Sequence, residues 1–141
     1  MSIITLKGRV IVAGNCKGKA LVTDKPITFL GGVNPKTGTL VERGHDLYGQ
    51  KITDKILCFP HGHGSTVGSY VIYALKKHGL APRAMITENA DTVVTVGAII
   101  AEIPMLDQVD IKQIKTGDIV EIRTVDDSAL VKVLREKSQC I

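Results

Sequence analysis

The side chains best suited to chemistry gather in residues 58–70, CFPHGHGSTVGSY, where an apolar run gives way to a helix-like pattern. This stretch contains three glycines, two histidines and two serines. Such a junction can hold an anion on backbone amides, bind a metal through histidines, or present a serine oxygen to a substrate. The spacing of these residues decides among the three.

Glycine spacing excludes the common nucleotide-binding motifs. In residues 14–20, GNCKGKA, only three residues separate the two glycines, and alanine stands where a P-loop needs serine or threonine. A dinucleotide fingerprint starting at Gly62 would place its third glycine at position 67, but that glycine comes one residue late. We therefore expect a plain turn over 14–18, and we retain only simple anion binding for the start of the helix.

The same stretch matches neither a nucleophile elbow nor a metal site. An elbow centred on Ser65 needs glycines at positions 63 and 67, where histidine and valine stand. His61 and His63 could chelate a metal, but no third histidine or carboxylate follows at ligand spacing. We therefore expect no metal site here, and the simpler reading is that these are ordinary loop histidines.

Two roles remain open for Ser65. Serine is favoured at helix N-caps, where its oxygen accepts a hydrogen bond from the first turn. A cap does not require Gly62 and Gly64, however, and such glycines permit close approach of a substrate to the backbone. Amides and the helix dipole would also stabilise negative charge on a hydroxyl held there. To accept a proton, the serine would still need strong positive help from a substrate, metal or partner.

Composition narrows the class of partner. The 141-residue chain carries a formal charge of +4, which suits an anionic small molecule or an acidic protein surface. Aromatic residues make up only 4% of the chain, too few for the stacking platforms of a single-stranded nucleic-acid binder. No apolar run approaches the ~20 residues of a membrane span, and the start lacks a signal-peptide pattern. We expect a cytoplasmic protein with no nucleic-acid or membrane partner.

The cysteine content is also typical of a cytoplasmic protein. The three cysteines, Cys16, Cys58 and Cys140, are odd in number, which argues against a disulfide framework. They are far apart and form no C-x-x-C pair, so alone they make a poor metal or iron–sulfur site. We expect free thiols.

Strand patterns dominate both ends of the chain and must position the Ser65 stretch. A glycine-rich segment, GGVNPKTG, at 31–38 has the composition of a loop with no regular element. The expected strands are 3–13, interrupted at Lys7-Gly8, then 20–23, 55–59 and 83–87, with a hairpin over 116–134 that turns at 125–128.

Two helices are expected in the middle of the chain. Residues 66–78 carry apolar residues at 67, 70, 71, 74 and 75, the stripe of an amphipathic helix, and Gly79 follows as a stop. Residues 91–102 could form a helix or a strand, and Asp91 as an N-cap with Pro104 as a stop favours the helix. The chain therefore reads as one compact domain over residues 1–141, of mixed α/β class.

Two long stretches resemble a known family. They are GGVNPKTGTLVERGHDLYGQKITDKILCFPHGHGSTVGSYVIYAL, residues 31–75, and GLAPRAMITENADTVVTVGAIIAEIP, residues 79–104. Together they are similar to the small-subunit, or swivelling-domain, family of aconitase X, and most of all to its archaeal type. The Gly-Gly-x-Asn-Pro-x-Thr-Gly loop and the Gly-x-Gly-Ser-x-x-Gly-Ser turn are specific in combination, and the likeness spans nearly the whole chain.

The resemblance implies a fold, a partner and a reaction. The fold would be the swivelling β/β/α domain of aconitase. A larger subunit would supply three cysteines for a [4Fe–4S] cluster and most of the substrate site, in a heterodimer or higher assembly. The archaeal type is a hydro-lyase that removes water from (R)-5-phosphomevalonate to give trans-anhydromevalonate 5-phosphate in the mevalonate pathway to isoprenoids. Related members act on other hydroxy acids such as hydroxyproline.

The resemblance also assigns roles to residues. The family's proton-accepting serine lies in the Gly-x-Gly-Ser turn and corresponds to Ser65, with Gly64 beside it. The loop that would bind substrate corresponds to Gly31, Gly32, Val33, Asn34 and Pro35. The residues alone also allow a different class, a non-catalytic adaptor or anion-binding module that uses the same turn to grip a partner or a phosphate.

Overall fold

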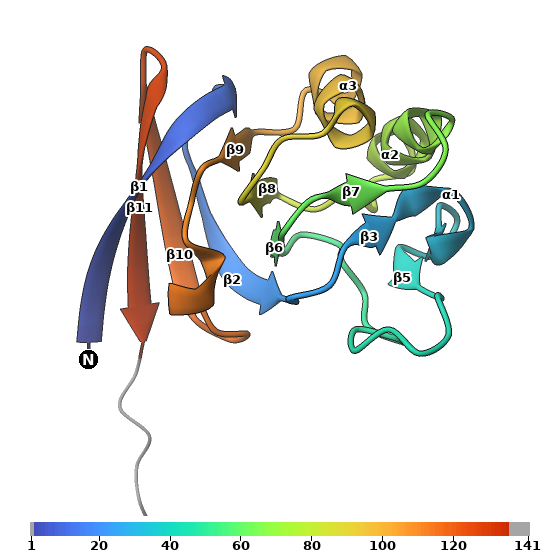
Figure 1. Ribbon diagram of the computed structural model, residues 1–141, viewed down its shortest axis with the longest axis horizontal. Helices are drawn as coiled ribbons and strands as arrows, with labels where there is room; N and C mark the ends of the chain where they lie inside the picture. Colours follow the sequence, from blue (N-terminus) through green and yellow to red (C-terminus); the bar gives the residue numbers. More distant parts are fainter. Residues whose placement is uncertain (1, 136–141) are drawn as a thin grey trace, which may run out of the picture.

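The structure, a computed structural model, describes residues 2–135 and is built around a closed barrel with helices to one side (Figure 1). Around the barrel the strand order is β1-β11-β10-β2-β6-β8-β9. The barrel strands are β1 (Ser2–Val12), β2 (Cys16–Val22), β6 (Ile56–Phe59), β8 (Ala84–Thr87), β9 (Met105–Asp107), β10 (Ile119–Val125) and β11 (Ser128–Arg135). The expected mixed α/β class is confirmed, and Cys140 lies outside the described residues.

The barrel combines two kinds of strand pairing. Strands β1, β11, β10 and β2 pair in antiparallel fashion, whereas β2, β6, β8 and β9 pair in parallel. The hairpin expected over 116–134 is confirmed as β10–β11, and Asp126 in its turn has a φ of 54°. The turn expected over 14–18 is wrong from Cys16 onward, because Cys16 already pairs with Ile122 on β10 and extends β2.

Strand β1 is unbroken at Lys7-Gly8, where the sequence predicted an interruption. Gly8 pairs with Ala129 on β11. A Cβ atom built on Gly8 would lie 2.6 Å from Val109 Cγ2 and 3.2 Å from the Asp107 carbonyl oxygen. The glycine therefore allows another segment to pass close to the strand, and it does not end the strand.

Two helices, α2 (Gly68–Lys77) and α3 (Thr92–Ala101), cover one side of the parallel strands, and a short kinked segment, α1 (Phe29–Gly32), lies next to α2. The two helices expected from the sequence are confirmed, but the buried face of α2 differs from the expected stripe. Val67 and Tyr70 are exposed, while Ile72 is buried against Gly97 of α3. Periodicity could not show that α3 packs beside α2. No helix within residues 2–135 is long and apolar enough to cross a membrane.

Short elements complete the helical side, and the sequence patterns did not reveal them. Strands β3 (Ile27–Thr28) and β7 (Gly62–His63) pair in parallel, and β4 (Val33–Asn34) and β5 (Thr39–Leu40) pair in antiparallel fashion. Strand β4 lies inside the segment expected to be irregular. A 3₁₀ helix, η1 (Ile111–Gln113), precedes β10. Each of these elements has only two or three residues, too few to show a periodicity.

Strands β6 and β8 separate two hydrophobic cores. One core fills the barrel and contains Ile56, Cys58, Ala84 and Ile86 from these strands. The other lies beneath the helices and contains Leu57, Phe59 and Met85 from the same strands. Every residue of β6 and β8 is buried, as expected of parallel strands covered on both faces. The helical side, which carries the Ser65 turn, therefore rests on strands that also belong to the barrel.

Candidate active site

The turn that contains Ser65 connects β7 to α2 and faces solvent. Ser65 is exposed, its Oγ accepts a hydrogen bond from the Val67 amide at 3.2 Å, and its carbonyl oxygen accepts one from the Gly68 amide at 2.9 Å. The helix begins at Gly68 and its N-cap is Val67, which makes no side-chain capping bond. The prediction that Ser65 is the N-cap is therefore wrong. The serine instead closes the turn that precedes the helix, a typical serine-turn hydrogen bond.

The direction of the hydrogen bond at Ser65, from the Val67 amide to Oγ, affects how well that oxygen can bear a negative charge. An N–H that donates to a serine oxygen stabilises negative charge on that oxygen more than a neutral hydroxyl. The start of a helix adds the positive end of the α2 dipole. Both features would lower the cost of a negative charge on the Ser65 oxygen, which is exposed to solvent.

Gly62 is required by packing against α3. Its amide donates a hydrogen bond to Asp91 Oδ1 at 2.7 Å, and a Cβ atom built on it would collide with Val94 and lie 2.7 Å from Asp91 Oδ2. Asp91 is also the N-cap of α3, where it accepts a hydrogen bond from the Val94 amide at 3.1 Å. The sequence predicted the cap but not the second bond. This single carboxylate ties the start of α3 to the strand that leads into Ser65.

Gly64 and Gly68 are likewise constrained by the chain itself. Gly64 has a φ of 96°, and a Cβ atom on it would lie 2.8 Å from Thr28 Cγ2. A Cβ atom on Gly68 would lie 3.0 Å from Val93 Cγ1. The space that these glycines leave is filled by neighbouring elements of the same chain. The contacts therefore give the glycines a packing role, and the substrate access expected from the sequence stays a prediction.

The glycine loop lies next to the Ser65 turn because β3 and β7 are parallel neighbours. Thr28, the last residue of β3, pairs with His63, so the chain leaves both strands at the same edge. A Cβ atom on Gly68 would lie 3.5 Å from the backbone nitrogen of Leu30 in α1. Gly31, with a φ of 84°, has nothing within 4 Å of its Cβ position and is open to solvent. Figure 1 shows α1, β3 and β7 together beside the start of α2.

The second half of the predicted substrate loop lies elsewhere. Val33 is buried in the helical core. Asn34 Oδ1 accepts a hydrogen bond from the Lys36 amide at 2.9 Å, and the Pro35 carbonyl oxygen lies 2.9 Å from Nδ1 of His78. His78 follows the last residue of α2, a helix about 15 Å long. The structure thus brings Gly31 and Gly32 to Ser65 but holds Pro35 at the opposite end of the helix.

The histidines near the turn differ in their surroundings. His45 is buried; its Nδ1 lies 3.1 Å from the Leu47 amide nitrogen and from Asp46 Oδ1, and its Nε2 lies 3.1 Å from the Pro26 carbonyl oxygen. His61 is half-buried and its Nδ1 lies 2.7 Å from the carbonyl oxygen of the next residue. His63 is exposed. His45 is therefore structural, and His63 is the histidine free to face a bound molecule.

Ser69, the second serine of the motif, does not share the site. Its Oγ donates a hydrogen bond to the Val93 carbonyl oxygen at 2.7 Å, and the side chain is buried. It joins α2 to α3. Of the two serines, only Ser65 presents its oxygen to solvent.

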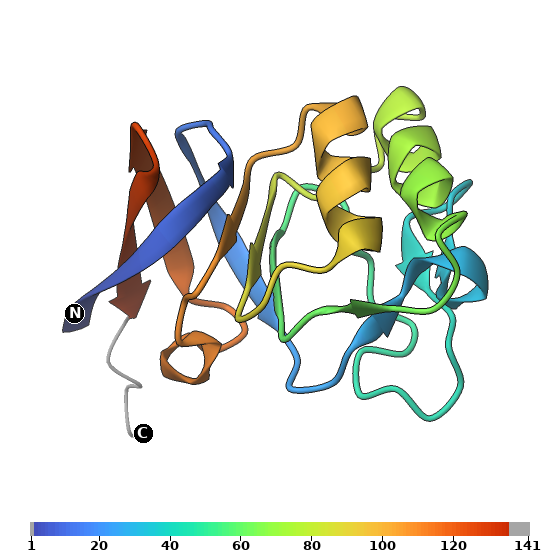
Figure 2. The same ribbon diagram turned by 45° about the horizontal axis from the view of Figure 1, so that its top comes forward.

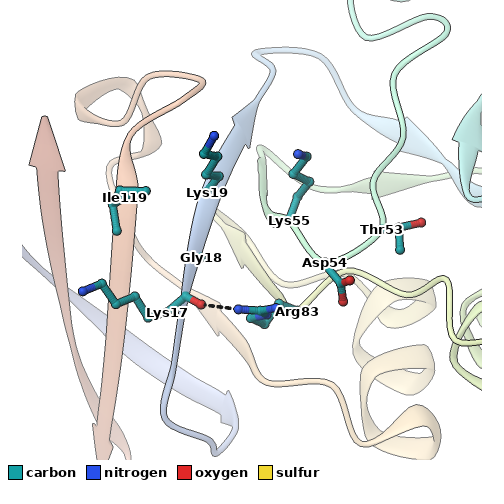
Figure 3. Close-up of a pocket in the computed structure, with 8 residues that line it drawn as sticks. All are labelled: Lys17, Gly18, Lys19, Thr53, Asp54, Lys55, Arg83 and Ile119. Atoms are coloured by element: carbon teal, nitrogen blue, oxygen red, sulfur yellow. Dashed lines mark hydrogen bonds between the residues drawn. The ribbon is translucent and has the colours of Figure 1, made fainter. Parts of the chain in front are cut away.

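A hollow of about 350 Å³ opens at the end of the parallel strands opposite to the Ser65 turn (Figure 3). Because Ala20, Ile56 and Ala84 are in register, the residues just before them, Lys19, Lys55 and Arg83, form a row across the middle of β2 and the starts of β6 and β8. Asp54 lines the same hollow. Ser65 lies beyond the carboxyl end of β6, so the length of that strand, about 13 Å, separates the two places. The basic hollow is not part of the Ser65 site.

Comparisons with known proteins identify the family. A family model described as the aconitase X swivel domain matches residues 5–133. The chain belongs to the aconitase X swivel-domain family. A Thermococcus kodakarensis protein named phosphomevalonate dehydratase small subunit is 52% identical over 131 residues, which span 93% of this chain and 97% of that protein. A Methanosarcina acetivorans protein of the same name is 51% identical over 84% of this chain and 85% of its own length.

A solved structure gives the same answer for the fold. The crystal structure of aconitase X from T. kodakaraensis, in its holo-form, matches with a TM-score of 0.89 and 50% identity. The match covers 94% of this chain and 99% of that chain. The family and the swivelling fold predicted from the two motifs are thus confirmed for this aconitase X swivel domain.

Membership of an aconitase-like dehydratase family implies an iron–sulfur cluster, and the two thiols within residues 2–135 do not fit one. Cys58 is fully buried in the barrel, where burial raises the pKa of its thiol far above the ordinary range. Burial also raises the pKa of the half-buried Cys16. Cluster ligands must be thiolates that converge on one place. Within residues 2–135, no group of three or more cysteine, histidine or acidic side chains converges on one point.

Proposed function

We propose that this chain is the small subunit of a phosphomevalonate dehydratase and that Ser65 is its proton acceptor. The enzyme would convert (R)-5-phosphomevalonate to trans-anhydromevalonate 5-phosphate, in the mevalonate route to isoprenoids. The names of relatives that are about half identical over most of their length support the reaction. The observation that carries the residue assignment is the exposed Ser65 Oγ, which accepts an amide hydrogen bond beside the start of α2.

The reaction breaks a C–H bond next to the substrate carboxylate and the C–O bond on the neighbouring carbon. Ser65, as an alkoxide, takes the proton on Oγ while the electron pair of the C–H bond forms the double bond and hydroxide departs. Alkoxide is a costly state for serine in water. The Val67 amide and the α2 dipole lower that cost, and further positive charge has to come from the partner's side of the site.

For the substrate contacts, we propose that Gly31, Gly32 and Gly64 flank the molecule at the edge where β3 and β7 end. Gly31 is the most open of them. Val33, Asn34 and Pro35 would contribute by fixing the shape of the loop, since they engage the core, the adjoining turn and the end of α2. A net charge of +4 suits a substrate that carries both a carboxylate and a phosphate.

The partner in this proposal is the large subunit. Relatives named small subunits imply a larger one. We place the [4Fe–4S] cluster on that subunit, because the two described thiols of this chain, Cys16 half-buried and Cys58 buried, belong to no group of metal ligands. The swivel domain would then supply the proton acceptor to a site whose metal lies across the subunit boundary, and it would be inactive alone.

The proposal is tested by reconstitution. The large subunit alone, this chain alone and the two together are assayed for loss of water from (R)-5-phosphomevalonate, with product followed by mass spectrometry. Only the pair should turn over. Ser65→Ala should lower turnover by about 10²- to 10⁴-fold, the usual contribution of a positioned acid or base, while complex formation is unchanged. Ser128→Ala is the matched control, because Ser128 is also exposed but lies on the barrel hairpin.

The outcomes separate the two functional classes. Near-normal turnover of Ser65→Ala would show that this serine only closes its turn. Turnover by the chain without a partner would contradict the two-subunit enzyme. If the chain binds a partner with no dehydration in any combination, it is an adaptor and not an enzyme subunit.

A further inference from the structure

The exposed faces of α2 and α3 are unusually poor in charge. Residues 62–75 contain no Asp, Glu, Lys or Arg, and neither do the ten residues of α3; the charges of α2, Lys76 and Lys77, are confined to its last turn, away from Ser65. Charged residues make up 23% of the whole chain. Solvent-facing helix surfaces normally carry charges, whereas the centres of protein interfaces are depleted of them. Both helices therefore present surfaces of the composition found in interfaces.

Large apolar side chains point outward from both helices. Val67 and Tyr70 are one turn apart at the start of α2, and Tyr70 is 68% exposed. Val96 and Ile100 are one turn apart on α3, and each is 41% exposed. Figures 1 and 2 both show the two helices side by side. The four side chains line a common hollow of about 340 Å³, together with Thr66, Ser69, Thr92 and Val93; we refer to this hollow as the helix groove.

The helix groove starts at the proposed proton acceptor. Its first lining residue, Thr66, directly follows Ser65. On the other side of the same turn lies Leu30, which is also exposed and whose backbone nitrogen approaches Gly68. The Ser65 turn thus lies close both to the groove and to the backbone of α1. A partner that covers Ser65 is expected to touch the groove as well.

We propose that the helix groove is the surface on which the large subunit docks, with Ser65 at its edge. This inference rests on the proposed function, which requires the partner's substrate site to meet Ser65. A second copy of this chain is a poorer occupant. It would cover Ser65 with a surface that, over residues 2–135, brings no converging set of metal ligands.

Interface size fixes how far the contact extends. Stable interfaces bury about 800 Å² per partner, roughly a tenth of the 7616 Å² that this chain exposes. Two adjacent helices of ten residues present roughly 300 Å² in projection, from a length of about 15 Å and a width of about 20 Å. The groove alone is therefore too small. The contact must continue across the Ser65 turn to Leu30 and Gly31, which closes the site to water from that side.

Charge reversal on the groove tests the docking surface. Tyr70→Glu and Val96→Glu each place a carboxylate in the groove, and glutamate is a good helix former. Leu130→Glu is the control, because Leu130 is 51% exposed on the outer face of β11. Binding of each variant to the purified large subunit is measured by titration calorimetry, with circular dichroism to confirm folding. We expect at least 100-fold weaker binding for each groove variant and less than threefold change for Leu130→Glu.

Failure of the docking proposal differs from failure of the proposed function. If folded groove variants bind the large subunit as tightly as the unaltered chain, the groove is not the docking surface, although the enzyme assignment stands. If the unaltered chain binds no large subunit at all, the proposed function fails first. If sedimentation shows that the chain alone forms a dimer that Tyr70→Glu dissociates, with binding to the large subunit unchanged, the groove is a homodimer surface and the proposal is overturned.

Discussion

The barrel and the helical side of this swivel domain have surfaces that differ in their ion pairs and in their exposed apolar side chains. The three Arg–carboxylate ion pairs of residues 2–135 are all made by barrel strands or the segments beside them: Arg9–Asp107, Arg123–Glu121 and Arg135–Asp118. The helical side has none among the described residues and instead exposes the apolar side chains of the helix groove. The barrel surface has the composition of a surface exposed to water, whereas the surface of the helical side has the composition of an interface.

Exposed apolar residues on the barrel do not contradict this difference. Leu130 pairs across the sheet with Lys7 on one side and Arg123 on the other. Leu130 and the exposed Val125 line one hollow, but Lys7 and Arg123 line it too, and apolar atoms contribute more than half of most protein surfaces. The helix groove differs because its apolar residues are adjacent and no charge interrupts them. Arrangement, more than exposure, distinguishes the two regions.

The largest effects should come from the two cores, and they test whether the regions are independent. Leu75→Ala beneath the helices and Ile122→Ala in the barrel each remove a fully buried side chain and should each lower the free energy of unfolding by about 2–5 kcal/mol. Because β6 and β8 belong to both cores, both variants should unfold in one transition. The signals to compare are tyrosine fluorescence, since the three tyrosines all lie on the helical side, and far-ultraviolet circular dichroism of the whole chain.

Coincident curves from the two probes would show that the barrel and the helical side are one cooperative unit. A fluorescence transition that precedes the dichroism transition in Leu75→Ala would separate them. In that case the difference between the regions would be one of stability as well as surface.

The next effect compares two glycines under similar steric pressure. An alanine Cβ at Gly62 would meet Val94 and Asp91, and one at Gly8 would meet Val109 and the Asp107 backbone. Each substitution should destabilise the chain by about 1–3 kcal/mol. Only Gly62→Ala should also lower turnover of the reconstituted enzyme, because it displaces β7 and the Ser65 turn. Thermal unfolding and turnover per mole of assembled complex measure the two consequences separately.

The glycine comparison fails in a recognisable way. If Gly8→Ala reduces turnover per assembled complex as much as Gly62→Ala does, then strain anywhere in the chain reaches the site. The barrel could not then be treated as a passive support.

The sequence predicted the longer elements of this fold because their signals are local. Asp91 at the start of α3 and the β10–β11 hairpin were both correctly placed. The family motifs also placed the chain in the swivel-domain family, and with it the serine in an exposed turn. Signals of this kind need only neighbouring residues, a cap, a turn or a short motif.

The rest depended on contacts between distant segments. The start of β2 at Cys16 follows from its pairing with β10, more than a hundred residues away. The buried face of α2 was wrong at Val67 and Tyr70, since no periodicity records that α3 packs against the Ile72 side. At the site, the bond from Gly62 to Asp91 and the split of the glycine loop between two ends of α2 are tertiary facts. The errors at Val67 and Tyr70 fall on the groove proposed for the partner.

The smallest effect concerns acid stability and belongs to the barrel. Side-chain hydrogen bonds from Arg135 hold the pKa of Asp118 below its ordinary value of 3.8. A carboxyl whose pKa is lower in the folded state stabilises the fold above the unfolded value, and that contribution is lost as pH falls through the folded pKa. Asp118→Asn should therefore lower the free energy of unfolding at pH 7, and its deficit should shrink below about pH 4.

Urea unfolding of the unaltered chain and of Asp118→Asn between pH 3 and pH 7 measures this deficit. Glu121, the other described carboxyl whose pKa is lowered, chiefly by a hydrogen bond from Arg123, lies in β10, and Asp118 directly precedes that strand. Hydrogen exchange at pH 3 to 4 should therefore rise first in the amides of β10 and β11. If the deficit of Asp118→Asn is the same at every pH, the charge of Asp118 makes no contribution to the free energy of unfolding, and the side chain acts only through its shape. If exchange instead rises first in α2 and α3, acid acts on the helical side, and ion pairing no longer distinguishes the barrel from it.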